Sequence, residues 1–283
     1  MATSKSFVLV HGAWHDHHAW DYVVPLLEHA GHMAIALDLP GAGITAKFPA
    51  SYSRKPFDLE AFKIEISPNS NVTQMERTEA VIDAIRQVNA ESDSKAVLVG
   101  HSLGGATVSH VGEAISDELS AVVYLSGLML PPSMLPVTML EDKLMAESVT
   151  PKLHVGDPTL VGALRINPKS NDPKYRSLAK EAFYEDVTDE VFQLALSHLC
   201  TDESMQVLKV PSPITKKNFG GISRYFIECL KDHALPIAAQ REMVRLVDYA
   251  MKNSTTVYGL NTSHSPFFSQ PEALANILEK IGG

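Results

Sequence analysis

Cysteine is scarce in this sequence, and long apolar runs are missing. Two cysteines in 283 residues, Cys200 and Cys229, cannot form a disulfide framework, and we expect two free buried thiols rather than a single bridge. No apolar stretch approaches the roughly 20 residues of a membrane-spanning helix. Residues 1–6 lack the basic start and the apolar stretch of a signal peptide. These shortages predict a cytoplasmic protein with no membrane partner.

Runs of lysine or arginine are also missing. The chain carries 24 basic and 33 acidic residues, a formal net charge of −9. Binding to nucleic acid or to an anionic membrane surface needs a basic patch, so neither is an expected partner. Hydrophobic residues make up 45% of the chain and charged ones 20%, which is enough for a sizeable core. The length fits one large domain, or one domain with an inserted lobe.

Short apolar runs alternate with helical patterns at both ends of the chain. Strands are predicted at 7–10, 33–39, 96–99, 121–125, 222–230 and 255–260. Helices are predicted at 20–30, 72–88, 103–115, 236–251 and 271–281. Apolar strands that alternate with helices predict an α/β fold with a mostly parallel central sheet and helices on both faces.

Two stretches interrupt this alternation. Residues 41–71 are rich in Pro, Ser and Lys and show no clear period, as in a long functional loop. Residues 131–221 are largely helical in pattern, with no obvious strand pair. We therefore predict a core made of 1–130 and 222–283, with 131–221 inserted as a helical cap.

The sequence Gly-His-Ser-Leu-Gly-Gly at 100–105 is the most informative motif in the chain. A predicted strand precedes it and a predicted helix follows it, the context in which a Gly-x-Ser-x-Gly turn lifts a serine hydroxyl clear of the sheet edge. The start of the helix directs backbone N–H groups and the positive end of its dipole at that hydroxyl. We interpret Ser102 as a nucleophile, the alternative being a chance match in an ordinary loop.

A serine nucleophile needs a base, and the base needs an orienting acid. After a turn of this kind the chain order is serine, then Asp or Glu, then histidine. His264 follows the predicted strand 255–260 in a turn-forming segment that ends at Pro266, whereas His110 lies in the helix after the nucleophile. We predict that His264 is the base, the alternative being an ordinary loop histidine.

The acid is expected where the preceding strand ends. Asp232 lies in the exit loop of strand 222–230, ahead of a helix that Pro236 opens. The rival Glu228 belongs inside that strand, and Asp38 precedes Ser102, which is the wrong chain order. We predict Asp232 as the acid, the alternative being a turn or capping residue.

A tetrahedral intermediate needs backbone donors for its oxyanion. One predicted donor is the N–H of Leu103, the residue after the nucleophile. The second is the N–H of Ala13 in the loop after the first strand, with its neighbour Trp14 as the alternative. Gly12 permits a close backbone path at this point.

Four histidines crowd the same early loop: His11, His15, His17 and His18. Their spacing fits no common zinc pattern, so no metal site is predicted. We expect His11 to pack and hydrogen-bond beneath the oxyanion loop.

Five segments together resemble those of the α/β-hydrolases, in particular the group of plant methyl esterases, hydroxynitrile lyases and bacterial pyrethroid-hydrolysing carboxylesterases. The segments are FVLVHGAW at 7–14, PLLEHAGH at 25–32, AIALDL at 34–39, VGHSLGG at 99–105 and TSHSP at 262–266. The resemblance covers about the first forty residues, the middle around Ser102 and about the last sixty. The predicted cap and the 41–71 loop match poorly, so the resemblance does not identify a substrate.

The resemblance implies an α/β-hydrolase fold and a Ser102–His264–Asp232 triad, with Leu103 and Ala13 at the oxyanion. Hydroxynitrile lyases of this group carry a lysine after the catalytic histidine and a threonine in place of Gly12. Here Ser265 and Gly12 occupy those places, so lyase chemistry is not expected. Dehalogenases and epoxide hydrolases of this fold use an aspartate nucleophile, which Ser102 argues against.

The predicted function is hydrolysis of a small to medium hydrophobic carboxylic ester through an acyl-enzyme, without a cofactor. The alternatives are a small-molecule receptor on a hydrolase fold, a lactonase, an acyltransferase and a cofactor-free dioxygenase. Trp14, Leu128 and Met129 are the predicted substrate-binding residues, with ordinary core or hinge positions as the alternative for the last two. The oligomeric state stays open, a homodimer included.

Overall fold

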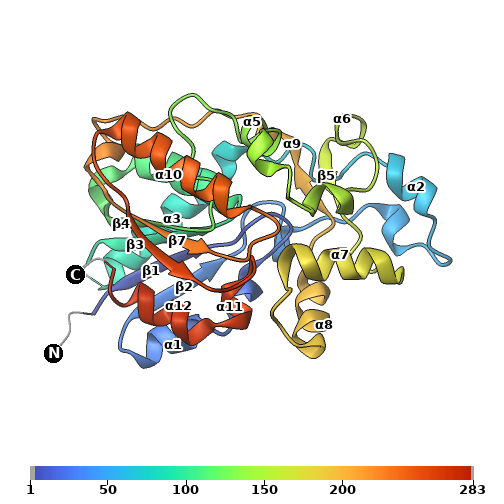
Figure 1. Ribbon diagram of the computed structural model, residues 1–283, viewed down its shortest axis with the longest axis horizontal. Helices are drawn as coiled ribbons and strands as arrows, with labels where there is room; N and C mark the ends of the chain where they lie inside the picture. The colour runs from blue at the N-terminus through green and yellow to red at the C-terminus, as the bar shows by residue number, and fades with distance from the viewer. Residues whose placement is uncertain (1–3, 93, 282–283) are drawn as a thin grey trace.

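The computed structural model describes residues 4–92 and 94–281, which form a parallel six-stranded sheet with helices on both faces (Figure 1). Residues 1–3, part of the segment without a signal-peptide pattern, lie outside the described residues. The strand order is β2-β1-β3-β4-β7-β8. The strands are β1 (Ser6–Val10), β2 (Met33–Leu37), β3 (Ala96–His101), β4 (Leu119–Leu125), β7 (Ser223–Cys229) and β8 (Thr256–Leu260). The predicted α/β fold with a mostly parallel central sheet is confirmed.

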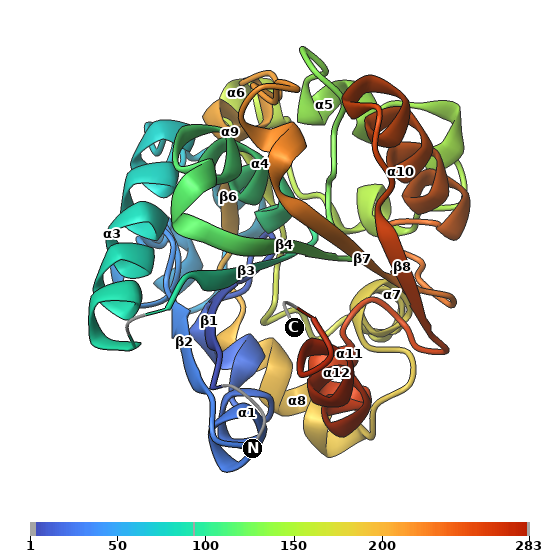
Figure 2. The ribbon, with the colours of Figure 1, turned by 90° about the vertical axis from the view of Figure 1, so that its left-hand side faces the viewer.

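The central strands are apolar because both of their faces are covered. Every residue of β1 and β3 is buried, as expected for parallel strands packed on two sides. Figure 2 shows the two helix layers on opposite faces of the sheet. One layer holds α3 (Gln74–Ser92), α4 (Gly104–Ala114) and α10 (Ile237–Met251). The other holds α1 (Val24–His29), α11 (Pro266–Ser269) and α12 (Pro271–Leu278).

The segment between β4 and β7 lies beyond one end of the sheet (Figure 1). Its helices are α5 (Pro136–Leu140), α6 (Pro158–Val161), α7 (Pro173–Phe183), α8 (Asp189–His198) and α9 (Met205–Leu208). The sequence predicts no strand pair here, and that prediction is wrong. Strands β5 (Ala163–Arg165) and β6 (Asp202–Ser204) form an antiparallel pair. Three residues per strand are too few for an alternating pattern to be visible in the sequence.

The irregular stretch 41–71 packs against this inserted segment. It contains the short helix α2 (Leu59–Ile64), which lies beside α6 in Figure 1. Tyr52 and Phe62 of the stretch form an apolar cluster with Val155 of the inserted segment. The two regions that interrupt the strand–helix alternation therefore make one continuous layer.

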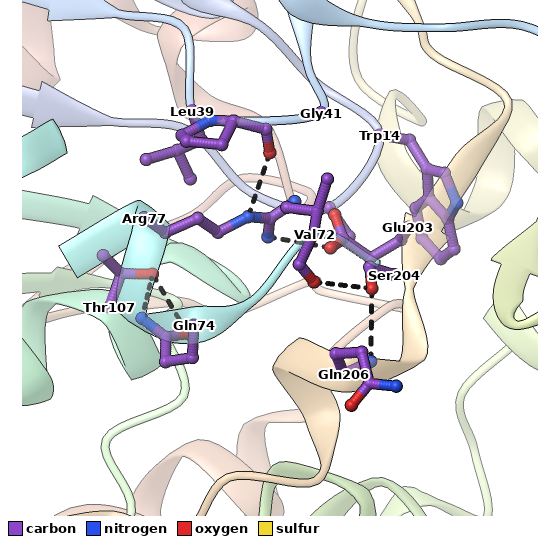
Figure 3. Close-up of polar contacts among 12 residues, drawn as sticks. Trp14, Leu39, Gly41, Val72, Gln74, Arg77, Thr107, Glu203, Ser204 and Gln206 are labelled. Carbon is purple, nitrogen blue, oxygen red and sulfur yellow. Dashed lines mark hydrogen bonds and ion pairs between the residues drawn. The ribbon is translucent and has the colours of Figure 1, made fainter. Parts of the chain in front are cut away.

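Two buried ion pairs hold β6 in place. Arg165 and Asp202 pair at 2.7 Å with both side chains fully buried. Arg77 of α3 pairs with Glu203 at 2.7 Å, and these side chains are 4% and 3% exposed (Figure 3). Ser204 Oγ donates to the carbonyl of Val72 at 2.8 Å. Breaking such a pair would leave an uncompensated charge in the interior, which is costly. The Arg77–Glu203 pair therefore ties β6 firmly to the start of α3.

Both cysteines are free and buried, as predicted. Burial raises the pKa of the Cys200 thiol to about 12, so it stays protonated at neutral pH. Within residues 4–92 and 94–281, no helix combines the length and the apolar character that crossing a bilayer requires.

Candidate active site

Ser102 occupies a strained turn between β3 and α4. Its φ of +51° is in the left-handed region, which a non-glycine residue rarely adopts. Its N–H donates to the carbonyl of Leu125 at 3.2 Å, and its own carbonyl accepts from the N–H of Leu128 at 2.9 Å. A Cβ on Gly104 would lie 2.5 Å from the carbonyl oxygen of His11, so no larger residue fits there. The structure thus forms the strand, turn and helix that the motif predicts.

His264 and Asp232 meet in the loops that follow β8 and β7. His264 Nδ1 donates to Asp232 Oδ2 at 2.6 Å, and the two side chains are 2% and 0% exposed. The other carboxylate oxygen, Oδ1, accepts from the backbone N–H groups of Ala234 and Leu235, each at 2.7 Å. Because both oxygens have donors, the carboxylate is fixed in orientation, and it fixes the imidazole in turn.

The rival carboxylates lie elsewhere. Glu228 is inside β7 and pairs with Arg241 at 3.0 Å. Asp38 accepts from the ring and the backbone of His17 and from the N–H of Ile44. Neither carboxylate lines the cavity that holds Ser102 and His264.

Ser102 and His264 line one cavity, yet within the described part of the chain no hydrogen bond joins their side chains. Bonds between nucleophile and base are commonly long in unliganded enzymes and tighten around substrate. The arrangement leaves His264 Nε2 free to accept the serine proton, because the other ring nitrogen donates to Asp232.

The predicted oxyanion loop presses against the nucleophile. A Cβ on Gly12 would lie 2.7 Å from Ser102 Cβ, so glycine is required for the approach. The backbone N–H groups of Ala13 and Leu103 donate to no other residue that the structure describes, and the same holds for Trp14. Both predicted donors, and the alternative to one of them, are therefore available to an oxyanion.

Two buried histidines orient that loop. His11 Nε2 accepts from the N–H of Leu39, so its Nδ1–H donates to the carbonyl of Gly12 at 2.8 Å. His15 Nδ1 donates to the carbonyl of Ala13, and its Nε2 accepts from the hydroxyl of Tyr184, each at 2.8 Å. The prediction that His11 bonds beneath the loop is confirmed. The support from Tyr184, just after α7 in the inserted segment, was not predicted.

Burial keeps both imidazoles neutral. Removal from water lowers the pKa of His11 to about 4 and that of His15 to about 3, from an ordinary value of 6.5. Neutral rings retain one acceptor nitrogen each, which these hydrogen bonds require. The loop therefore keeps its hydrogen bonds throughout the neutral pH range.

These depressed pKa values predict acid destabilisation. Below pH 6.5 the unfolded chain binds protons at these two rings that the folded chain does not, so the free energy of unfolding falls as pH falls. Each ring contributes about 1.4 kcal/mol per pH unit until its folded pKa is reached. Urea denaturation between pH 7.5 and 5 measures this slope. In His15→Gln the slope is expected to be shallower by about that amount, and an unchanged slope would contradict the assignment.

The remaining histidines of the early loop lie near a carboxylate. Asp16, His17 and His18 place one potential ligand atom each within 4.8 Å of one another, a proximity that the sequence analysis did not foresee. Protein partners already engage them: His17 bonds Asp38, and His18 bonds Asp21, each at 2.8 Å. These three residues do not line the cavity that holds Ser102 and His264. They therefore do not contact a molecule bound beside Ser102.

Ser126, a fully buried residue directly after β4, was not predicted as part of the site. Its Oγ donates to Asp232 Oδ2 at 2.5 Å, the oxygen that also accepts from His264. Its φ of +38° is a second left-handed backbone position beside the site. The positive φ and this contact arise from tertiary packing, and no local pattern in the sequence indicates them.

Removing this hydroxyl should weaken any reaction in which His264 acts as a base. In Ser126→Ala the carboxylate loses one donor, so it holds the charged imidazole of the transition state less firmly. A charge-assisted hydrogen bond is worth about 1.5–3 kcal/mol, and a partial loss predicts a decrease in kcat of about tenfold. Ser109→Ala, which removes a buried hydroxyl bonded to Tyr124, is the control. Equal kcat values for the two variants would refute a positioning role for Ser126.

The cavity at the sheet end has a volume of about 360 Å³, within the range of ligand pockets. Trp14, Leu103 and Leu128 line it, as do Ser102 and His264. Most of the remaining wall is apolar and includes Leu140, Met145, Leu164, Phe183, Met205 and Leu208. The site therefore fits a mainly hydrophobic molecule.

Met129 is not part of this wall, and its predicted substrate-binding role is wrong. Its side chain is fully buried in the cluster beneath α3, α4 and α10. A backbone bond from the N–H of Met129 to the carbonyl of Gly127 turns the chain here, and Leu128 faces the cavity while Met129 faces the core. The methionines that do line the cavity, Met145 and Met205, come from the inserted segment.

Comparison with known proteins agrees with this architecture. Pyrethroid hydrolase of Sphingobium wenxiniae is 27% identical over 277 residues, which cover 98% of this chain and 87% of that protein. Methylesterase 2 of Arabidopsis thaliana is 26% identical over 284 residues, covering 98% and 95%. The crystal structure of a pyrethroid hydrolase from Sphingobium faniae JZ-2 superposes with a TM-score of 0.75 at 25% identity, covering 99% and 98%.

The chain is shorter than some of its relatives. It spans 64% and 56% of the lengths of two Arabidopsis thaliana relatives named as chloroplastic methylesterases. The family model of the Alpha/beta hydrolase family nevertheless matches residues 7–277. Because this match runs from the first strand of the sheet to the last helix and includes the turn at Ser102, the chain belongs to the alpha/beta hydrolase family.

Proposed function

We propose that this protein is a carboxylesterase-type serine hydrolase that cleaves small to medium hydrophobic esters. The observation that carries the proposal is the buried His264–Asp232 pair at 2.6 Å, in the same cavity as a serine on a strained turn. The mainly apolar wall supports a hydrophobic ester as the substrate. The names of the relatives, methylesterase and pyrethroid hydrolase, are consistent with ester cleavage.

In the proposed mechanism, His264 Nε2 takes the proton of Ser102 Oγ as that oxygen attacks the ester carbonyl. The backbone N–H groups of Ala13 and Leu103 stabilise the resulting oxyanion. Collapse breaks the bond to the leaving alcohol, which receives the proton from His264. Water then attacks the acyl-enzyme, with His264 again as base, and this releases the acid and restores Ser102. Asp232 holds the imidazole in the required tautomer and stabilises its charged form.

A rapid-mixing experiment with p-nitrophenyl acetate and p-nitrophenyl butyrate tests this proposal. An acyl-enzyme mechanism with slow deacylation predicts an initial release of one equivalent of p-nitrophenol per active site, followed by a slower steady rate. Mass spectrometry of the acid-quenched protein should find the acyl group on the peptide that contains Ser102.

A folded protein that releases no p-nitrophenol and acquires no acyl group would contradict the proposal. That result would favour a receptor or a non-hydrolytic relative on the same fold. Faster turnover with an added alcohol or amine, with transfer of the acyl group to it, would indicate an acyltransferase instead. Preference for cyclic esters over all open-chain esters would indicate a lactonase.

A further inference from the structure

The polar side chains in the cavity wall differ in whether they make hydrogen bonds to other residues of the protein. Besides His264, three have protein partners. Ser148 Oγ donates to the carbonyl of Ala234 at 2.8 Å, and Trp14 Nε1 donates to the carbonyl of Leu164 at 2.9 Å. Thr159 Oγ1 donates to Asp157 at 2.7 Å. These groups are held by the protein itself and have little need of a ligand.

Thr150 and His154 differ from these side chains in having a buried polar atom without a partner in the described chain. Thr150 Oγ1 and His154 Nε2 are buried and have no hydrogen-bond partner among residues 4–92 and 94–281. They are the only cavity-lining residues with such an atom in that part of the chain. Buried polar groups in native proteins are normally paired, so two orphans in one wall call for an explanation.

The two orphans belong to one short element. Thr150 begins a single 3-10 turn, Thr150–Leu153, and His154 caps its end. The ring of His154 packs against Trp14, with the ring centroids 6.0 Å apart. Trp14 directly follows Ala13, the proposed oxyanion donor. The unpaired groups therefore line the same cavity as Ser102 and Ala13, and His154 packs on the neighbour of the proposed oxyanion donor.

The charge state of this pair limits what it can bind. Burial lowers the pKa of His154, so the ring is neutral and offers one donor and one acceptor. The threonine hydroxyl also donates and accepts. Glu141 is the only carboxylate that lines the cavity within the described residues, and it would repel an anionic ligand. An uncharged group with an oxygen atom fits these conditions.

We propose that Thr150 and His154 form a subsite for a neutral oxygen-bearing group, a hydroxyl or a carbonyl, on an otherwise apolar ester. The inference rests on the proposed esterase function and narrows its substrate class. In the unliganded protein the two polar atoms are buried and lack partners among the described residues. A substrate oxygen would supply one when rotation of the side chain turns its polar atom toward the cavity. The subsite thus selects oxygenated apolar esters over plain hydrocarbon esters of the same shape.

Matched esters that exchange a hydroxyl for a methyl group test the subsite. One pair is p-nitrophenyl 4-hydroxyphenylacetate and p-nitrophenyl 4-methylphenylacetate, and further pairs move the substituted position along the acyl and the alcohol parts. A site built to bond a hydroxyl discriminates against an analogue that lacks it. We expect kcat/KM to favour the hydroxyl member by about tenfold or more at one position at least.

Variants assign the preference to these side chains. In Thr150→Val and His154→Phe the hydroxyl-to-methyl ratio of kcat/KM should decrease, and in the double variant it should fall to about one or below. Thr159→Val removes a hydroxyl that the protein already satisfies, so it should leave the ratio as in wild type. A wild-type preference for methyl at every position, or a hydroxyl preference that survives in the double variant, would overturn the subsite.

Binding measurements separate this inference from the proposed function. If wild type hydrolyses none of the esters, the esterase proposal fails, and calorimetric titration with 4-hydroxyphenylacetamide and 4-methylphenylacetamide still tests the subsite. Tighter binding of the hydroxyl amide by wild type, lost in the double variant, would support it. Equal affinities for the two amides would reject it.

Discussion

Ser102→Ala is expected to abolish ester hydrolysis, with a decrease in kcat of at least about 10⁴-fold. The reason is that this hydroxyl stands on a left-handed turn and lines the same cavity as His264, the partner of Asp232. Without it no acyl-enzyme forms, and the remaining acceleration comes only from binding and from the oxyanion donors. The turn should persist, because alanine tolerates the backbone position no worse than serine does.

Steady-state rates with p-nitrophenyl butyrate measure this loss, and circular dichroism checks that the variant is folded. Ser254→Ala, at an exposed serine outside the cavity, is the matched control and should keep the wild-type rate. A folded Ser102→Ala variant with more than about one hundredth of wild-type activity would exclude Ser102 as the nucleophile.

Asp232→Asn should lower kcat by about 10³- to 10⁴-fold while leaving the fold intact. Two backbone N–H groups point at Oδ1, so the asparagine must place its carbonyl oxygen there. Its NH₂ group then faces His264 and Ser126 in place of a carboxylate oxygen. A neutral imidazole beside that NH₂ must accept at Nδ1, which puts its proton on Nε2. The ring then cannot take the proton of Ser102.

The control for this experiment is Glu228→Gln, which changes the carboxylate nearest in the sequence and removes its charged pairing with Arg241. Its kcat should stay within about twofold of wild type, because neither Glu228 nor Arg241 lines the cavity. If instead Glu228→Gln were the more damaging change, Asp232 would not be the acid of the triad. Thermal unfolding of both variants separates lost chemistry from lost stability.

Much of this site could be predicted because its residues follow sequence-local rules. A four-residue apolar run before Gly100 predicts a buried strand, and the glycines around Ser102 predict a tight turn. Chain order then restricts the search for partners to the loops after late strands, which leads to Asp232 and His264. Each inference needs only neighbouring residues and the topology of a parallel sheet, in which strand ends share one edge.

The remaining features depend on contacts between distant segments, which local patterns do not encode. Ser126 reaches Asp232 across 106 positions of sequence, and Tyr184 reaches His15 across 169. Met129 lies just past a core strand, where the pocket mouth is expected, but the direction of its side chain depends on the backbone after β4. The strand pair β5–β6 is equally invisible, since three-residue strands carry no period.

The buried pairing of Arg77 with Glu203 has a consequence for protein engineering. Met205 and Leu208 line the cavity and lie two and five positions after Glu203. An engineer who wants to change the substrate specificity could therefore replace this stretch with the corresponding stretch of a relative. If the grafted stretch has no acidic residue at position 203, the guanidinium of Arg77 is left buried without its charged partner. The set of residues that must be exchanged together is therefore larger than the pocket wall, because it includes Arg77 on α3, far away in the sequence.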